Sequence, residues 1–147
     1  MATEKKVGEI IENAGFEPLK NKGIIVKYAP QNLSEKIAKF FNMDFYVLQL
    51  CKNEVILIPF NQVATLKKEV ALQIPYSSIK SVNISEDSLN YVISIETDTD
   101  VIRLTTQQKE LSNLRSSGIL SVESKGLSIK NWHKENLITT LEALRNL

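Results

Sequence analysis

The sequence has a single cysteine and no long apolar run, and each of these shortages excludes a class of protein. Cys51 alone cannot form an internal disulfide, which favours a reducing compartment. The longest apolar run, Val55–Phe60, is far shorter than the roughly 18–20 residues that a membrane-spanning helix needs. Residues 1–15 also lack the continuous apolar core of a secretory signal. We therefore predict a cytoplasmic protein.

An excess of charge is missing as well, since eighteen Lys and Arg stand against seventeen Asp and Glu, for a net charge of +1. This balance argues against nucleic acid as a partner, because nucleic-acid binders concentrate positive charge. The sequence has no Gly-rich phosphate loop, no paired catalytic carboxylates and no Ser-x-x-Lys motif. We therefore expect no cofactor.

What the sequence does contain is an alternating apolar pattern between Val70 and Thr106. Apolar residues two apart, separated by polar turns, are typical of half-buried antiparallel strands. A chain of 147 residues is long enough for one domain without covalent staples. The stretch therefore predicts a bent antiparallel sheet or partly open barrel. Its alternating residues are Val70, Leu72, Ile74, Tyr76, Val82, Ile84, Tyr91, Ile93, Ile95, Ile102 and Leu104.

Helical spacing occurs near both ends of the chain. The i, i+3, i+4, i+7 pattern from Val7 to Ala14 predicts a helix over residues 4–14 that ends at Gly15. Asn131 predicts the N-cap of a final helix that runs through Leu147. The inward face of this helix is expected to consist of Leu137, Ile138, Leu141 and Leu144.

Two hairpins, one strand and two further helices complete the predicted elements. The hairpin of strands at 45–51 and 55–60 is apolar on both faces, so it should be covered on each side, and the terminal helices are the expected covers. The other predicted elements are a strand at 23–29, helices at 33–41 and 105–117, and a hairpin of strands at 119–123 and 127–130.

Three strand segments in the middle of the chain resemble bacterial pleckstrin-homology-like domains of the GRAM type. They read Tyr46-Val-Leu-Gln-Leu50, Val55-Ile-Leu-Ile58 and Leu72-Gln-Ile-Pro-Tyr-Ser-Ser-Ile-Lys-Ser-Val82, with the Ile-Pro pair and the spaced Ile and Val of those domains. The resemblance covers residues 44–106 and the C-terminal helix. It implies an α+β fold in which residues 132–147 close a bent sheet, and by analogy a binding or scaffold role.

On this resemblance the chain divides near residue 43. Residues 1–43 are expected to form a helix–strand–helix extension packed on the main domain, and residues 44–147 the pleckstrin-homology-like domain with an insertion at 107–130. Whether the extension adds a strand to the main sheet stays open. The first hairpin loop is only Lys52-Asn53, so the basic loop with which lipid-binding members of the family hold phosphoinositides has no counterpart here.

His133 and Cys51 are the only histidine and the only cysteine. A histidine at a helix start can be a general base or a metal ligand, and a Cys–His pair can supply nucleophile and base. The competing interpretation is structural, with His133 packed beside Trp132 and Cys51 a small buried hydrophobe at a strand end. Histidine metal sites need several convergent ligands. We therefore predict no catalytic residue and no metal site.

Acidic pairs occupy two consecutive predicted turns. Asp98-Thr99-Asp100 resembles the Asp-x-Asp that holds divalent cations, and Glu86-Asp87 lies in the preceding turn. If both turns lay at one end of the sheet, four carboxylates would gather there. Solvated turns are the favoured interpretation, since Asp stabilises turns by bonding its own backbone and a hard cation takes six or more oxygens.

A basic patch is the candidate binding site for an anionic membrane surface. Each lysine near such a surface contributes about 1 kcal/mol, although Glu17 and Glu69 dilute the effect. Charged loop tips that serve solubility are the alternative interpretation. The patch would consist of Lys20, Lys22, Lys67 and Lys68.

Together these observations predict a non-catalytic cytoplasmic interaction or scaffold module. It would bind a protein partner, or a second copy of itself as a homo-oligomer, through a sheet edge or the N-terminal extension. Weak peripheral binding to anionic membranes is the alternative. A small hydrolase or metal-dependent enzyme that uses Asp98, Asp100 or Cys51 with His133 is the third hypothesis.

Overall fold

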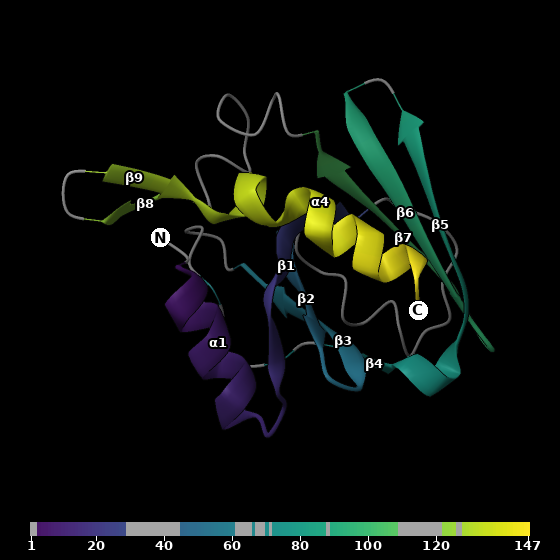
Figure 1. Cartoon of the computed structure of the whole chain (residues 1–147). Coiled ribbons are helices and arrows are strands. Elements are labelled where there is room, and N and C mark those ends of the chain that lie inside the picture. Colours follow the sequence, from purple (N-terminus) through teal and green to yellow (C-terminus); the bar gives the residue numbers. More distant parts are fainter. Residues whose placement is uncertain are drawn as a thin grey trace.

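The fold consists of a seven-stranded antiparallel sheet with a helix on each side (Figure 1). The computed structural model describes residues 3–28, 45–60, 66, 70, 72–87, 89–108, 122–125 and 128–147. The helices are α1 (Glu4–Asn13) and α4 (Trp132–Arg145), with a 3₁₀ turn η1 (Tyr76–Ser78). The strands are β1 (Pro18–Tyr28), β2 (Phe45–Cys51), β3 (Glu54–Pro59), β4 (Leu72–Pro75), β5 (Ile79–Asp87), β6 (Asn90–Thr97), β7 (Val101–Gln107), β8 (Val122–Lys125) and β9 (Ser128–Asn131).

The order of strands in the sheet is β4-β3-β2-β1-β7-β6-β5, so β1 lies at its centre. A strand from the first 43 residues is therefore part of the main sheet. β1 pairs with β7 only at Lys27 and Tyr28, which lie opposite Thr105 and Leu104. β4 and β5 are the two ends of the sheet, so it is open rather than a closed barrel. In Figure 1, α4 runs across the sheet between the β1–β4 half and the β5–β7 half.

Two apolar clusters pack on opposite faces of β1, β2 and β3. Leu48 of β2 belongs to the cluster that contains Leu141 of α4. Its neighbour Val47 belongs to the other cluster, with Ile11 of α1 and Trp132. Successive strand residues point to opposite faces, so a strand that is apolar throughout needs a cover on both. The prediction that the two terminal helices cover the apolar hairpin is confirmed.

The predicted caps at Gly15 and Asn131 are confirmed, and α4 ends at Arg145 rather than at Leu147. The Thr3 side chain accepts a hydrogen bond from the Lys6 amide, and α1 is followed by Gly15 at φ 92°. The Asn131 side chain accepts from the Lys134 amide at 3.1 Å. The inward assignment of Ile138 is wrong, because this side chain is 43% exposed. One residue along a helix turns by about 100°, which takes it off the face of Leu137.

Three predicted boundaries change. β1 begins at Pro18 rather than at residue 23. β7 continues to Gln107, so the helix predicted to begin at residue 105 is wrong over its first residues. The second hairpin lies at 122–125 and 128–131. The predicted helix at 33–41 and residues 109–117 of the predicted helix at 105–117 lie outside the described residues. None of the helices in the described part is long and apolar enough to cross a membrane.

Candidate functional site

α4 lies along the part of β1 that β7 leaves unpaired. A buried backbone N–H or C=O without a partner is costly, and here side chains three residues apart on the helix bond to strand residues two apart. We call this set of contacts the polar seam. Its hydrogen bonds run from the Ile25 N–H to His133 Nδ1 at 2.9 Å, from Asn136 Nδ2 to the Gly23 carbonyl at 3.1 Å, and from Thr139 Oγ1 to the Asn21 carbonyl at 2.8 Å.

His133 is the most buried member of the polar seam, with 0% of its surface exposed. Because the Ile25 N–H points at Nδ1, the ring hydrogen sits on Nε2, which lies 3.4 Å from the Gln107 carbonyl oxygen. Burial lowers the pKa of His133 to about 4, and the Gln107 carbonyl acts in the opposite direction. His133 is therefore neutral at pH 7 with both nitrogens engaged, which leaves neither for a substrate or a metal.

Adjacent threonines of α4 provide a matched test of hydroxyl bonding in the polar seam. Thr140 Oγ1 is buried and has no hydrogen-bond partner within the described part of the chain, whereas Thr139 Oγ1 donates to the Asn21 carbonyl. Thr140→Val keeps the shape and removes an unpaired polar atom, so it should raise the free energy of unfolding by about 1 kcal/mol. Thr139→Val should lower it by about 0.5–1 kcal/mol. Urea titration checks both, and changes of the same sign would contradict the assignment.

Cys51 is buried in the same layer as Trp132 and is not activated. Burial raises the pKa of its thiol to about 12, and the charge of Glu54 adds to the effect. The Tyr76 hydroxyl donates to the Cys51 carbonyl, and burial raises the pKa of this phenol to about 12 as well. Both nitrogens of His133 are engaged elsewhere, so this histidine is not placed to act as a base for the thiol.

The acidic turns do not come together. Asp87 precedes the β5–β6 turn and Asp98 lies in the β6–β7 turn. These turns are at opposite ends of β6. The four carboxylates therefore do not gather at one end of the sheet. Asp98 lies 3.6 Å from Lys80 Nζ, and Asp100 accepts from Thr99 Oγ1 at 2.9 Å. Within the described ranges, no group of three or more His, Cys, Asp or Glu side chains is placed to hold a metal ion.

The structure describes half of the predicted basic patch. Lys20 is exposed and Lys22 half-buried, and both lie in β1. Lys67 and Lys68 lie outside the described residues. The four lysines therefore stay a sequence prediction as a group.

No protein-family model, no curated protein and no solved structure matches this chain.

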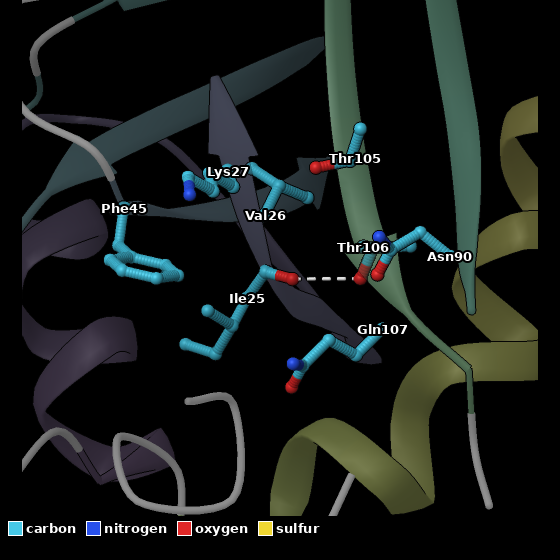
Figure 2. A pocket seen from close by; sticks show the side chains of 8 residues that line it. All are labelled: Ile25, Val26, Lys27, Phe45, Asn90, Thr105, Thr106 and Gln107. Carbon is cyan, nitrogen blue, oxygen red and sulfur yellow. Dashed lines mark hydrogen bonds between the residues drawn. The ribbon is translucent and has the colours of Figure 1, made fainter. Parts of the chain in front are cut away.

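The first cavity, which we call the β1–β7 cleft, opens where these two strands diverge (Figure 2). It has a volume of about 160 Å³. Thr106 Oγ1 donates to the Ile25 carbonyl at 2.8 Å, and Lys27 Nζ lies 5.8 Å from the centre of the Phe45 ring. Of its eight lining residues only Lys27 carries a charge. The cleft can form hydrogen bonds but contains no acid–base pair.

The second cavity, which we call the bulge cavity, lies between α1, β1 and the start of α4 and has a volume of about 180 Å³. It exists because β1 is irregular: Pro18 pairs with Cys51 but Gly23 pairs with Gln49, so five steps on β1 face two on β2. Asn21 adopts φ 59° within this bulge. A Cβ on Gly23 would lie 2.5 Å from Gln49 Oε1, so any other residue here would have to displace the Gln49 amide.

Sequence reasoning missed the polar residues of this region, although signals for them exist. Gln49 is a lone polar residue in the apolar strand 45–51, and a strand expected to be buried on both faces must satisfy such a side chain internally. His133, Asn136 and Thr140 lie at i, i+3 and i+7 beside the leucine stripe of the last helix. That spacing places them on one face.

Proposed function

We propose that this protein is a non-catalytic interaction module that binds an extended segment of a protein partner along the outer edge of β5. The observation that carries the proposal is that β5, nine residues long, ends the sheet. No described strand pairs with its outer side. An edge strand presents unpaired N–H and C=O groups, to which a partner segment can add as a further strand. Figure 1 shows β5 at the outside of the molecule.

The two ends of the sheet differ in the way that this proposal requires. β4 has only four residues and ends at Pro75, and short edge strands and prolines are devices that prevent edge pairing. β5 has a register irregularity near Ile79 and charges at Glu86 and Asp87, which protect its ends. The segment Ser81–Ser85 between them has neither charge nor proline. The backbone N–H and C=O groups on the outer side of this central segment are therefore those to which a partner strand would pair.

The side chains of β5 indicate the chemistry of the partner. Val82 and Ile84 are half-buried and pack against the cluster that contains α4. Asn83 and Ser85 are exposed on the other face. A partner strand in register would place alternate apolar residues beside Val82 and Ile84. We therefore propose that the partner segment alternates apolar and polar residues.

Three features support the proposal of a non-catalytic, cytoplasmic binding module. His133 and Cys51 have structural environments that suppress their reactivity. The open antiparallel sheet with a helix across it is the coarse α+β arrangement from which we infer, by analogy, a binding role. The single cysteine is free and buried, which is compatible with a cytoplasmic setting.

The test is site-specific photocrosslinking in the native cell. A benzophenone amino acid at Asn83 should capture a protein, and the same group at Arg103 should not. Both side chains are exposed on one face of the sheet, but Arg103 lies two strands from the edge, since Asn83 pairs with Ser94 and Ser94 with Arg103.

The captured protein, once purified, should slow hydrogen exchange of the amides from Ser81 to Ser85. Equal capture at Arg103, or unchanged exchange, would overturn edge binding. A crosslinked dimer of this chain would assign the edge to self-association instead, and light scattering would confirm its mass.

A further inference from the structure

The bulge cavity contains an amide oxygen whose orientation is fixed. Both hydrogens of Gln49 Nε2 are donated, to the Leu19 carbonyl at 2.9 Å and to the Leu50 carbonyl at 2.8 Å. Flipping the amide would place Oε1 against two carbonyl oxygens, so the observed assignment holds. Gln49 is only 6% exposed. No described residue donates to its Oε1, which lies beside Gly23 in the cavity wall.

Asn136 places a second amide in the same wall, and its orientation is fixed in the same way by the acceptors of its two hydrogens. Its Nδ2 donates to Glu4 Oε2 at 3.0 Å and to the Gly23 carbonyl at 3.1 Å. The reversed amide would bring Oδ1 against a carboxylate and a carbonyl. Asn136 is 1% exposed, and no described residue donates to Oδ1. Two amide oxygens of largely buried residues, each without a donor among the described residues, therefore belong to the lining of one small cavity.

Charge and shape narrow the class of ligand. Glu4 adds a negative charge to the polar wall, while Val7, Leu19 and Trp132 form an apolar wall. Lys20 also lines the cavity, but its side chain is exposed and long enough to keep its ammonium in water. A ligand that fits both walls has several N–H donors, a positive charge and a short apolar tail.

We propose that the bulge cavity binds a guanidinium or primary ammonium group carried on a short aliphatic chain. Such cations have only donors, so they complement two free amide oxygens and a carboxylate. The volume of about 180 Å³ exceeds that of a cavity of about 150 Å³ which holds benzene. It therefore has room for a group the size of methylguanidinium. This site goes beyond the β5 edge and uses none of its residues.

The test compares two probes of one shape, methylguanidinium and neutral methylurea, each titrated into the full chain. Methylguanidinium should shift the indole N–H resonance of Trp132, the only tryptophan, and the side-chain amide resonances of Gln49, with saturation. Methylurea should bind at least tenfold more weakly. Equal affinities, or shifts that do not saturate at these resonances, would overturn the proposal.

Glu4→Gln is the informative variant, because glutamine still accepts from Asn136 but carries no charge. It should weaken methylguanidinium binding at least tenfold and leave methylurea binding unchanged. Glu9→Gln, at an exposed position of α1 outside the cavity, is the matched control and should bind as the parent does. A loss of the same size in Glu9→Gln would reduce the effect to general charge and overturn the site.

A capped arginine, N-acetylarginine amide, distinguishes the source of the cation. Tighter binding than methylguanidinium supports a basic side chain of a protein as the natural ligand, and weaker binding supports a free small amine. Failure of both probes would overturn the cavity proposal and leave crosslinking at β5 unaffected. The two proposals therefore fail separately.

Discussion

Replacing Leu137 by alanine is expected to lower the free energy of unfolding by about 2–5 kcal/mol, the range for a buried leucine. Leu137 is fully buried, at 0% exposed, in the cluster that joins α4 to both halves of the sheet. The loss has two parts, the burial of apolar side-chain atoms that is given up and the cavity that is left behind. The cavity persists because the strands on either side of α4 keep its walls apart. Denaturant unfolding followed by circular dichroism measures it.

The next residue in the chain supplies the control. Ile138 is 43% exposed, so Ile138→Ala should change the free energy of unfolding by no more than about 0.5 kcal/mol. Similar losses at both positions would mean that α4 does not pack through the leucine face.

Acidification should lower the free energy of unfolding through His133 by about 3 kcal/mol between pH 7.5 and pH 4. The pKa falls from 6.5 to about 4 on folding, and each pKa unit corresponds to about 1.4 kcal/mol. The folded state keeps the imidazole neutral, so the unfolded chain takes up the proton first as the pH falls. The contribution is complete above pH 6.5, declines below it, and levels off below about pH 4.

His133→Asn isolates this effect. The asparagine oxygen can accept the Ile25 N–H in the place of Nδ1 but does not titrate. The difference in free energy of unfolding between parent and variant should therefore shrink by about 3 kcal/mol from pH 7.5 to pH 4. A difference that stays constant over this range would show that the folded state accommodates a charged His133.

The apolar patterns allowed much of the fold to be predicted. The apolar runs in residues 45–60, the alternation in residues 72–106 and the caps at Asn131 and Gly15 located the strands β2 to β7 and the helices α1 and α4, because burial determines these patterns. The position of β1 was open, since period two states that a strand is half-buried but not which strand it joins. Ile138 was misplaced because Leu137 and Ile138 are adjacent and both apolar, so the sequence does not show which of the two faces the core.

The candidate sites were harder to predict for a physical reason. The bulge cavity depends on a register shift between Pro18 and Gly23, and such shifts depend on packing across the sheet rather than on local composition. The partners of His133 and Asn136 are backbone atoms of β1, which lie 108 and 113 residues away in the chain. Backbone groups are the same at every residue, so a sequence does not mark them as partners.

The polar seam has a consequence for how this chain is made on the ribosome. The central strand is synthesised early, yet part of its backbone edge forms its hydrogen bonds with residues 133–139. Until those residues leave the exit tunnel, the nascent chain carries an incomplete sheet whose middle strand is open to wrong pairings. Contacts of such high sequence separation also slow folding. We therefore expect native structure to form in one late step after synthesis rather than progressively during it.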